Sequence, residues 1–275
     1  MTLHVAVIGL GVGEQHARAF ASSPNVEVTW LYDLDVAKSE RLAHELGQGR
    51  VADNYQQILD DPQVDAVSIA TFDHLHFDGV CRAFGAGKHV FVEKPLCRTA
   101  AEVDEIAARW DKAGRPHLRS NLVLRGAPVY GWLKNAIAAG EFGEIYAFDG
   151  DYLYGRLEKI TEGWRKDVPD YSVMEGGGVH IIDLMLWLMG ETPAAVFTLG
   201  SKIATQGTGF QYDDFMAATF TGGKGVLIPD FIQAIQTGAD PAPAAEREFD
   251  LIRVIAAADA AHRDGSPQTI RPYPH

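Results

Sequence analysis

The stretch "VAVIGLGVGEQHA", residues 5–17, joins a short apolar run to a glycine-rich turn and then to residues with helical spacing. An apolar run of this length that stops at glycine is typical of a buried strand. Glycines between a strand and a helix allow the tight turn and close backbone approach that a dinucleotide pyrophosphate needs at a helix N-terminus. We therefore predict that Gly9, Gly11 and Gly13 form a cofactor-binding loop.

A carboxylate follows at the distance that such a loop requires. Asp33 ends the next predicted strand, residues 26–33, where it can bind the ribose diol of NAD and repel the 2′-phosphate of NADP. NAD is therefore the predicted cofactor, in preference to NADP. The usual fingerprint has its third glycine where this chain has Glu14, whose side chain we expect to point to solvent. His16 is expected to pack or to hydrogen-bond locally.

Strand and helix segments alternate over the first part of the chain. Predicted strands at residues 4–9, 26–33, 64–71 and 88–94 are each followed by a predicted helix, at residues 13–22, 35–46, 76–87 and 99–114. This alternation indicates βαβ units, whose right-handed crossovers give an α/β fold with a doubly wound parallel sheet. We predict an NAD(P)-binding Rossmann domain over residues 1–121.

The pattern changes after Asn121. The expected elements are helices at residues 127–140 and 178–190, strands at 143–155, 194–204 and 213–228, and two closing helices, the first at 228–238. These segments predict a smaller α+β domain over residues 122–275, with an open and mostly antiparallel sheet.

Bulk composition argues against several classes of protein. The 275 residues are 47% hydrophobic and 22% charged, as in ordinary globular proteins. The net charge of −13 argues against nucleic acid or an anionic membrane surface as partner, and no apolar run reaches membrane-spanning length. Cys81 and Cys97 form no metal-binding pattern, so we expect no metal site and a reducing compartment, by default the cytoplasm.

Polar residues gather where two predicted parallel strands end. Thr71 and His76 follow one strand, and Glu93 and Lys94 follow the next. Ligands of a doubly wound sheet bind outside the carboxyl ends of its strands. We therefore predict that these residues contact the cofactor.

The chain resembles the Gfo/Idh/MocA family, named after glucose-fructose oxidoreductase and inositol dehydrogenase. The resemblance rests on the glycine loop, "TFDHLH" at 71–76, "AGKHVFVEKPL" at 86–96, "WR" at 164–165 and "GGGVHIIDLMLWL" at 176–188. It implies an NAD-dependent enzyme that moves a hydride between a CH–OH group of a sugar or sugar derivative and nicotinamide.

The resemblance also implies catalytic roles. Lys94 would orient and polarise the substrate hydroxyl, and the Lys94–Pro95 bond would be cis. His180 would take the hydroxyl proton, which suits a side chain whose ordinary pKa is about 6.5. Many relatives carry an aspartate four residues before this histidine, where this chain has Gly176; Glu175 is the nearest substitute.

The second predicted domain offers side chains for the substrate. Asp183 shares a helix face with His180 and could hold its tautomer or bind a sugar hydroxyl. The other candidates are Asn121, Arg125, Tyr152, Trp164, Arg165 and Glu175. Because arginine binds carboxylates and phosphates bidentately, one hypothesis is an anionic or nucleotide-linked sugar; the alternative is a solvated loop of mixed charge.

Two other functions remain open on this sequence. One is a non-catalytic sensor of nucleotide or sugar on the same scaffold, and the other is an enzyme that retains its NAD and recycles it. The resemblance implies a second domain shorter than is usual in the family. The apolar sheet face has to be covered, so a homodimer or homotetramer is expected.

Overall fold

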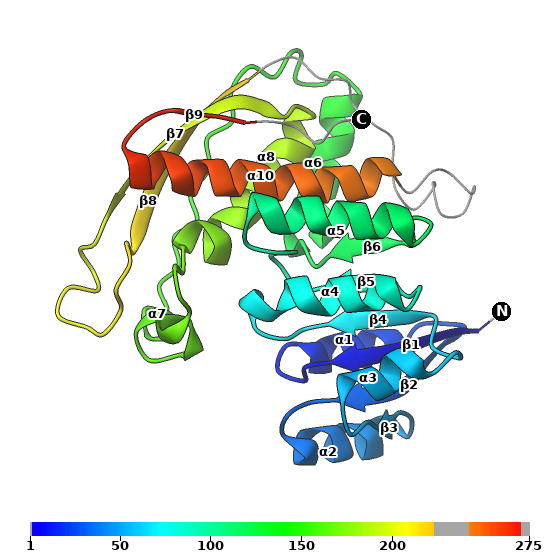
Figure 1. Ribbon diagram of the computed structural model, residues 1–275. Coiled ribbons are helices and arrows are strands. Elements are labelled where there is room, and N and C mark those ends of the chain that lie inside the picture. Colours follow the sequence, from blue (N-terminus) through cyan, green and yellow to red (C-terminus); the bar gives the residue numbers. More distant parts are fainter. Residues whose placement is uncertain (1, 223–241, 271–275) are drawn as a thin grey trace. The chain divides into compact units, whose positions relative to one another are not determined.

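The computed structural model describes residues 2–222 and 242–270. Its internal contacts divide these residues into two compact units. The first unit holds residues 2–121 and the start of the long helix α10 (Ala242–Asp264), as far as Glu248. The second holds residues 122–222 and 249–270. Each unit has its own sheet (Figure 1).

The first unit is built on a six-stranded parallel sheet with the order β3-β2-β1-β4-β5-β6. Its strands are β1 (Leu3–Ile8), β2 (Val26–Tyr32), β3 (Arg50–Val51), β4 (Ala66–Ile69), β5 (His89–Val92) and β6 (Leu118–Ser120). The strand order reverses between β1 and β4, and ligands of doubly wound sheets bind at this reversal. The predicted fold class is confirmed.

Helices connect these parallel strands. They are α1 (Gly13–Ala21), α2 (Val36–Leu46), α3 (Tyr55–Asp60), α4 (His76–Gly85) and α5 (Ala100–Lys112), with a 3-10 turn, η1 (Asp73–Leu75), before α4. Helix α5 starts in a capping box, in which Thr99 Oγ1 accepts from the Glu102 N–H and the Glu102 carboxylate accepts from the Thr99 N–H. This cap fixes the chain directly after the Lys94–Pro95 loop.

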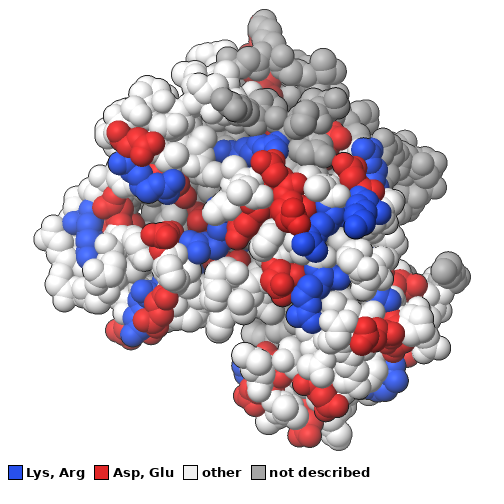
Figure 2. All heavy atoms as spheres, in the orientation of Figure 1, with Lys and Arg blue, Asp and Glu red and all other residues white. Residues whose placement is uncertain are grey.

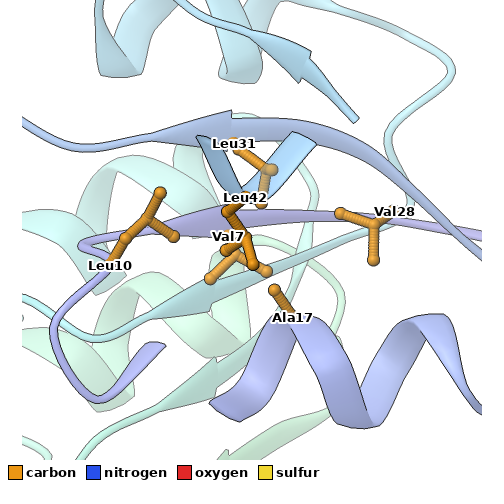
Figure 3. Close-up of a cluster of buried hydrophobic side chains, with 6 residues drawn as sticks. All are labelled: Val7, Leu10, Ala17, Val28, Leu31 and Leu42. Carbon is orange, nitrogen blue, oxygen red and sulfur yellow. The ribbon is translucent and has the colours of Figure 1, made fainter. Parts of the chain in front are cut away.

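Fully apolar packing holds α1 and α2 against the sheet (Figure 3). Ala17 of α1 and Leu42 of α2 meet strand residues of β1 and β2 and the loop residue Leu10. Burial of a leucine side chain contributes roughly 1.5–3 kcal/mol. The cluster therefore fixes the glycine loop, which lies between β1 and α1. Its members are Val7, Leu10, Ala17, Val28, Leu31 and Leu42.

The second unit combines helices with an antiparallel sheet of order β8-β7-β9. The strands are β7 (Pro193–Ser201), β8 (Phe215–Gly222) and β9 (Gln268–Thr269). The helices are α6 (Pro128–Ala138), α7 (Glu158–Thr161), α8 (Val179–Met189) and the rest of α10. Short turns are η2 (Val123–Gly126), η3 (Trp164–Asp167) and the π-helical η4 (Met174–Gly178).

One predicted strand of this unit is wrong. A strand was expected at 143–155, but residues 145–156 have no regular structure. Their aromatic alternation imitates a strand, but no described strand pairs with them, and Tyr146 is 93% exposed. The predicted helix at 228–238 and the end of the strand predicted at 213–228 lie outside the described residues.

The surface carries charges of both signs. Figure 2 shows acidic and basic side chains lying beside one another in small clusters on the visible face. In the described ranges, no helix combines the length and the apolar character needed to cross a membrane.

Candidate functional site

The glycine loop lies at the reversal of strand order, and its three glycines meet different surroundings. Gly9 has φ 83°, and a Cβ there would lie 2.5 Å from the carbonyl oxygen of Ala70, which follows β4. A Cβ on Gly13 would lie 2.9 Å from the Ala70 Cβ, so that glycine allows α1 to pack closely on the sheet. A Cβ on Gly11 would meet nothing within 4 Å. The open space at Gly11 fits the close approach of a pyrophosphate.

Asp33 follows β2 and is tied to the glycine loop. Its Oδ2 accepts a hydrogen bond from the Leu10 N–H at 2.6 Å, and its Oδ1 accepts from the Asp35 N–H at 2.9 Å. The side chain is 13% exposed. Each carboxylate oxygen has a second lone pair for a hydroxyl donor. The geometry suits a ribose diol and gives a 2′-phosphate a fixed negative neighbour.

Glu14 lies at the surface, as expected, but ion pairs hold its side chain there. Its carboxylate forms ion pairs with Arg18 at 2.7 Å and with Arg41 of α2 at 2.8 Å. Hydrogen bonds from Arg41 and Arg18 lower the pKa of Glu14 to about 2. The acidic residue in the first turn of α1 is therefore neutralised by two arginines, which reduces its repulsion of a nearby diphosphate.

Two polar side chains near the end of β4 lack partners. Thr71 Oγ1 and Asp73 Oδ2 are buried and have no hydrogen-bond partner among the described residues. Buried polar atoms are almost always satisfied in native proteins, by water or by a ligand where the protein offers no partner. Together with the open space at Gly11, these atoms fit a polar dinucleotide bound at this edge of the sheet.

The Lys94–Pro95 peptide bond is cis, as the resemblance implied. Glu93 precedes it directly after β5, and its Oε1 accepts hydrogen bonds from Asn121 Nδ2 at 2.6 Å and from His16 Nε2 at 3.0 Å. Burial alone would raise the pKa of Glu93, but these two hydrogen bonds outweigh it and keep that pKa below its usual value. Glu93 is therefore an anion that the protein itself holds in place.

His76 is completely buried at the start of α4. Its Nδ1 lies 2.6 Å from the Pro95 carbonyl oxygen and its Nε2 lies 3.2 Å from the Thr71 carbonyl oxygen. Desolvation lowers the pKa of His76, so the ring is neutral at physiological pH. The ring thus contacts the two backbone segments that follow β4 and β5.

In the second unit, His180 lies at the start of α8, where it is buried against an aromatic side chain. Its ring stacks on Tyr152, with centroids 5.5 Å apart and planes at 26°. Tyr152 in turn stacks on Tyr154. A Cβ at Gly177 would lie 2.7 Å from the Tyr152 ring, so this glycine makes room for it. Asp183 occupies the predicted place one turn further along α8.

Arg125 of η2 holds the Asp183 carboxylate. Arg125 Nε lies 3.0 Å from both carboxylate oxygens, and its NH2 group also contacts Oδ1. Asp183 is almost fully buried and Arg125 is 19% exposed. The pair neutralises both charges, so Arg125 does not offer an uncompensated cation to an anionic substrate.

The remaining predicted substrate residues lie on or near η3 and η4. The Arg165 guanidinium lies 4.3 Å from the centre of the Trp164 ring, and Trp164 packs on the cluster of Val168, Tyr171 and Phe210. Glu175 is buried within η4. A Cβ at Gly176 would lie 2.0 Å from the Tyr171 hydroxyl oxygen. The hydroxyl of Tyr171 therefore occupies the space of a side chain at this position.

His16 and Ser68 were missed as candidates. His16 is buried and packs edge-on against Phe91, as one of the two expectations had it, but its hydrogen bonds reach Ser68 Oγ at 2.9 Å and Glu93, both distant in the chain. The available signal was helical spacing, because Gly13, His16 and Ala17 form the buried face of α1. The described residues contain no cluster of three or more acidic, histidine or cysteine side chains that could hold a metal ion.

The chain is similar in sequence to several curated enzymes. It is 28% identical over 193 residues to inositol 2-dehydrogenase 2 of Saccharopolyspora erythraea, covering 70% of this chain and 55% of that protein. It is 26% identical over 246 residues to inositol 2-dehydrogenase of Salmonella typhimurium, covering 87% and 70%. A 1,5-anhydro-D-fructose reductase of Ensifer adhaerens is 32% identical over 177 residues, covering 61% and 50%. The chain thus spans about half the length of several of these relatives.

Solved structures share the fold. The myo-inositol 2-dehydrogenase of Lactobacillus plantarum superposes with a TM-score of 0.78 at 21% identity, covering 98% of this chain and all of that one. The scyllo-inositol dehydrogenase of Lactobacillus casei with bound NAD(H) and scyllo-inositol gives 0.76 at 17% identity, covering 98% and 99%.

Two models of one family match successive parts of the sequence. Residues 3–119 match an oxidoreductase family with an NAD-binding Rossmann fold, and residues 130–229 match the Gfo/Idh/MocA C-terminal domain. Together the two matches span more than half of the chain, and they agree with the motifs at 71–76, 86–96 and 176–188. The chain belongs to the Gfo/Idh/MocA family of oxidoreductases.

Proposed function

We propose that the chain is an NAD-dependent oxidoreductase that transfers a hydride between the CH–OH carbon of a neutral sugar or cyclic polyol and nicotinamide. The carboxyl edge of the first sheet carries this proposal. There the glycine loop, the unpartnered atoms of Thr71 and Asp73, and Lys94 follow the neighbouring strands β1, β4 and β5. The inositol dehydrogenases among the relatives support the same reaction class.

The first unit supplies the cofactor contacts. Gly9 and Gly13 shape the turn, Gly11 leaves space for the diphosphate, and Asp33 accepts from the ribose hydroxyls. The carboxylate of Asp33 favours NAD over NADP, since a 2′-phosphate would face a fixed negative charge. When bound, NAD supplies the acceptor for the hydride.

Lys94 and His180 carry the proton chemistry in this proposal. The Lys94 ammonium donates a hydrogen bond to the reacting hydroxyl oxygen and stabilises the negative charge that develops there. His180 takes the hydroxyl proton as the general base. The stacked ring of Tyr152 fixes the imidazole orientation.

A neutral polyol fits the second unit better than an anionic sugar. Arg125 is already neutralised by Asp183, and Arg165 lies on the Trp164 ring. The exposed part of Tyr152 offers an aromatic face of the kind that binds sugar rings. Residues 1–121 are accordingly assigned to the cofactor and residues 122–275 to the substrate.

The alternative of a non-catalytic sensor rests on Gly176, which lacks the carboxylate of many relatives. A sensor would bind NAD and sugar without redox change. The reducing cytoplasm remains the proposed compartment, because Cys81 and Cys97 are buried and form no disulfide.

A homo-oligomer is supported by one face of the second sheet. Phe197, Leu199 and Ser201 alternate along β7 and pair with Thr219, Ala217 and Phe215 of β8, so these side chains share a face. Leu199 is 61% exposed and Phe215 is 56% exposed. A second copy of the chain is the proposed cover for this apolar face.

Replacement of Gly11 by alanine tests the cofactor loop. The new methyl group meets no protein atom but occupies the space assigned to the diphosphate, so NADH binding should weaken by about tenfold or more while the melting temperature stays unchanged. NADH fluorescence titration measures the affinity. Gly85→Ala is the control, since position 85 is also open, and it should bind NADH normally. Equal affinity of both variants would contradict the loop assignment.

Replacement of the proposed acid–base groups tests the reaction. Lys94→Met and His180→Asn should each lower kcat for NAD reduction with a cyclic polyol by about 10²-fold or more, because general acid–base groups contribute on that scale. The exposed Lys112→Met and His44→Asn are matched controls and should keep wild-type rates. Wild-type turnover in either active-residue variant would refute its assigned role.

A charged residue on the apolar sheet face tests the oligomer. Leu199→Glu should convert a dimer or tetramer to a monomer in light scattering, because it places a charge in the covered face. Leu153→Glu is the control, since Leu153 is 86% exposed and lies in the irregular segment. A monomeric wild-type protein at micromolar concentration, or an unchanged mass for Leu199→Glu, would contradict the proposed interface.

A further inference from the structure

Two histidines from different helices contact residues on either side of Lys94, one through a side chain and one through the backbone. His16 of α1 meets the Glu93 carboxylate, with Nε2 3.0 Å from Oε1. His76 of α4 meets the Pro95 carbonyl oxygen, with Nδ1 at 2.6 Å. Lys94 is the one residue between these two contacts.

On the side of Glu93, the contacts decide where the His16 proton lies. Nε2 has two neighbours, Glu93 Oε1 at 3.0 Å and Asn121 Nδ2 at 3.2 Å. Asn121 Nδ2 donates to the same carboxylate oxygen at 2.6 Å, and a carboxylate can only accept, so Nε2 carries the proton and Nδ1 accepts from the Ser68 hydroxyl at 2.9 Å. The ring is 7% exposed and packs edge-on against Phe91, with centroids 5.2 Å apart. The second carboxylate oxygen of Glu93 accepts from the Lys94 N–H at 3.2 Å. His16 thus reaches the Lys94 backbone through a single carboxylate.

On the side of Pro95, the His76 ring lies between two backbone carbonyl oxygens but has one N–H to donate. The neutral His76 ring has one N–H, and the Pro95 oxygen at 2.6 Å is nearer than the Thr71 oxygen at 3.2 Å. Nδ1 therefore donates to Pro95, and Nε2 lies against Thr71. The ring is fully buried, so this bond is not exchanged with solvent.

We propose that His16 and His76 are positioning residues that fix the backbone on both sides of Lys94 and so hold its amine in the reactive position. The inference rests on the proposed function for the role of Lys94, but the two contacts themselves do not. The His76 bond is buried and the His16 bond is partly buried, and they join segments 19 and 77 residues apart in the chain. Long-range contacts of this kind hold a site residue rigidly in place.

Substitution of a histidine by asparagine or by glutamine distinguishes the contributions of its two ring nitrogens. The amide nitrogen of asparagine lies near the position of a histidine Nδ1, and that of glutamine lies near Nε2, because of their different lengths. His16→Gln keeps the donor to Glu93, whereas His16→Asn keeps only the side toward Ser68. For His76 the order reverses: His76→Asn keeps the donor to Pro95, and His76→Gln keeps only the side toward Thr71.

The proposal therefore predicts a crossed ranking. With NAD and a polyol substrate, kcat should stay close to wild type in His16→Gln and His76→Asn, and fall by about 10- to 100-fold in His16→Asn and His76→Gln, as for a misplacement of about 1 Å. KM and the NADH affinity should not follow this order. A second readout is the acylation rate of the Lys94 amine by acetic anhydride, followed by peptide mass spectrometry, which should show the same crossed order.

The outcomes are distinct. Two results would overturn the proposal. In one, the same amide, asparagine or glutamine, gives the higher kcat and acylation rate at both positions. In the other, both amides lower these rates equally at each position, which would mean that the histidines only fill buried space. If Lys94→Met retained full turnover, the proposed function would fail, and the acylation rates would still decide whether the two contacts position Lys94. Melting temperatures show whether each of the four variants is folded. If one of the two variants at a position is unfolded, the acylation rate of the folded variant is compared with that of the wild type.

Discussion

The hydrogen bonds to the partly buried carboxylate of Glu93 are the interaction on which the site depends. Burial disfavours this anion, and the hydrogen-bond donors around it outweigh that effect and keep its pKa below the usual value. His16 comes from α1, Asn121 follows β6, and the Lys94 N–H comes from the same loop. One charge therefore ties the first helix, the sheet and the lysine-bearing loop into a single arrangement, at the edge where the glycine loop also lies.

Much of this arrangement was readable from the sequence because it is local. The glycine loop and Asp33 follow from short motifs and from the rule that ligands bind at the carboxyl ends of parallel strands. The cis Lys94–Pro95 bond was implied by the family resemblance. Gly13 also belongs to this short motif. Its closeness to Ala70 shows that Gly13 allows the helix to pack on the sheet, a function that the usual fingerprint gives to a glycine at the position of Glu14.

The parts that could not be predicted depend on partners far away in the chain. His16 and Glu93 are 77 residues apart, and Arg125 and Asp183 are 58 apart, so no periodicity or spacing joins them. The segment at 145–156 has the residue alternation of a strand, but a strand forms only when a neighbouring strand pairs with it. The segment's own sequence does not show whether such a neighbour exists. The pairing of Arg125 likewise changed the substrate inference, since an arginine counted as a free cation proved to be internally neutralised.

The glycine run before α8 shows how this chain departs from many relatives. Tyr171 is buried, and its hydroxyl fills the space of a side chain at Gly176, so an aspartate there would displace a core residue. The acid–base chemistry of the account accordingly rests on Lys94 and His180 without that carboxylate.

The central claim is that a hydride passes directly from a substrate carbon to nicotinamide. The most direct measurement uses cyclic polyols and neutral sugars that carry deuterium on their CH–OH carbons, incubated with the protein and NAD, followed by mass analysis of the cofactor. The account predicts deuterium in the reduced nicotinamide for at least one polyol. Tight binding of NAD and polyol without any reduced cofactor would contradict it and would favour a sensor.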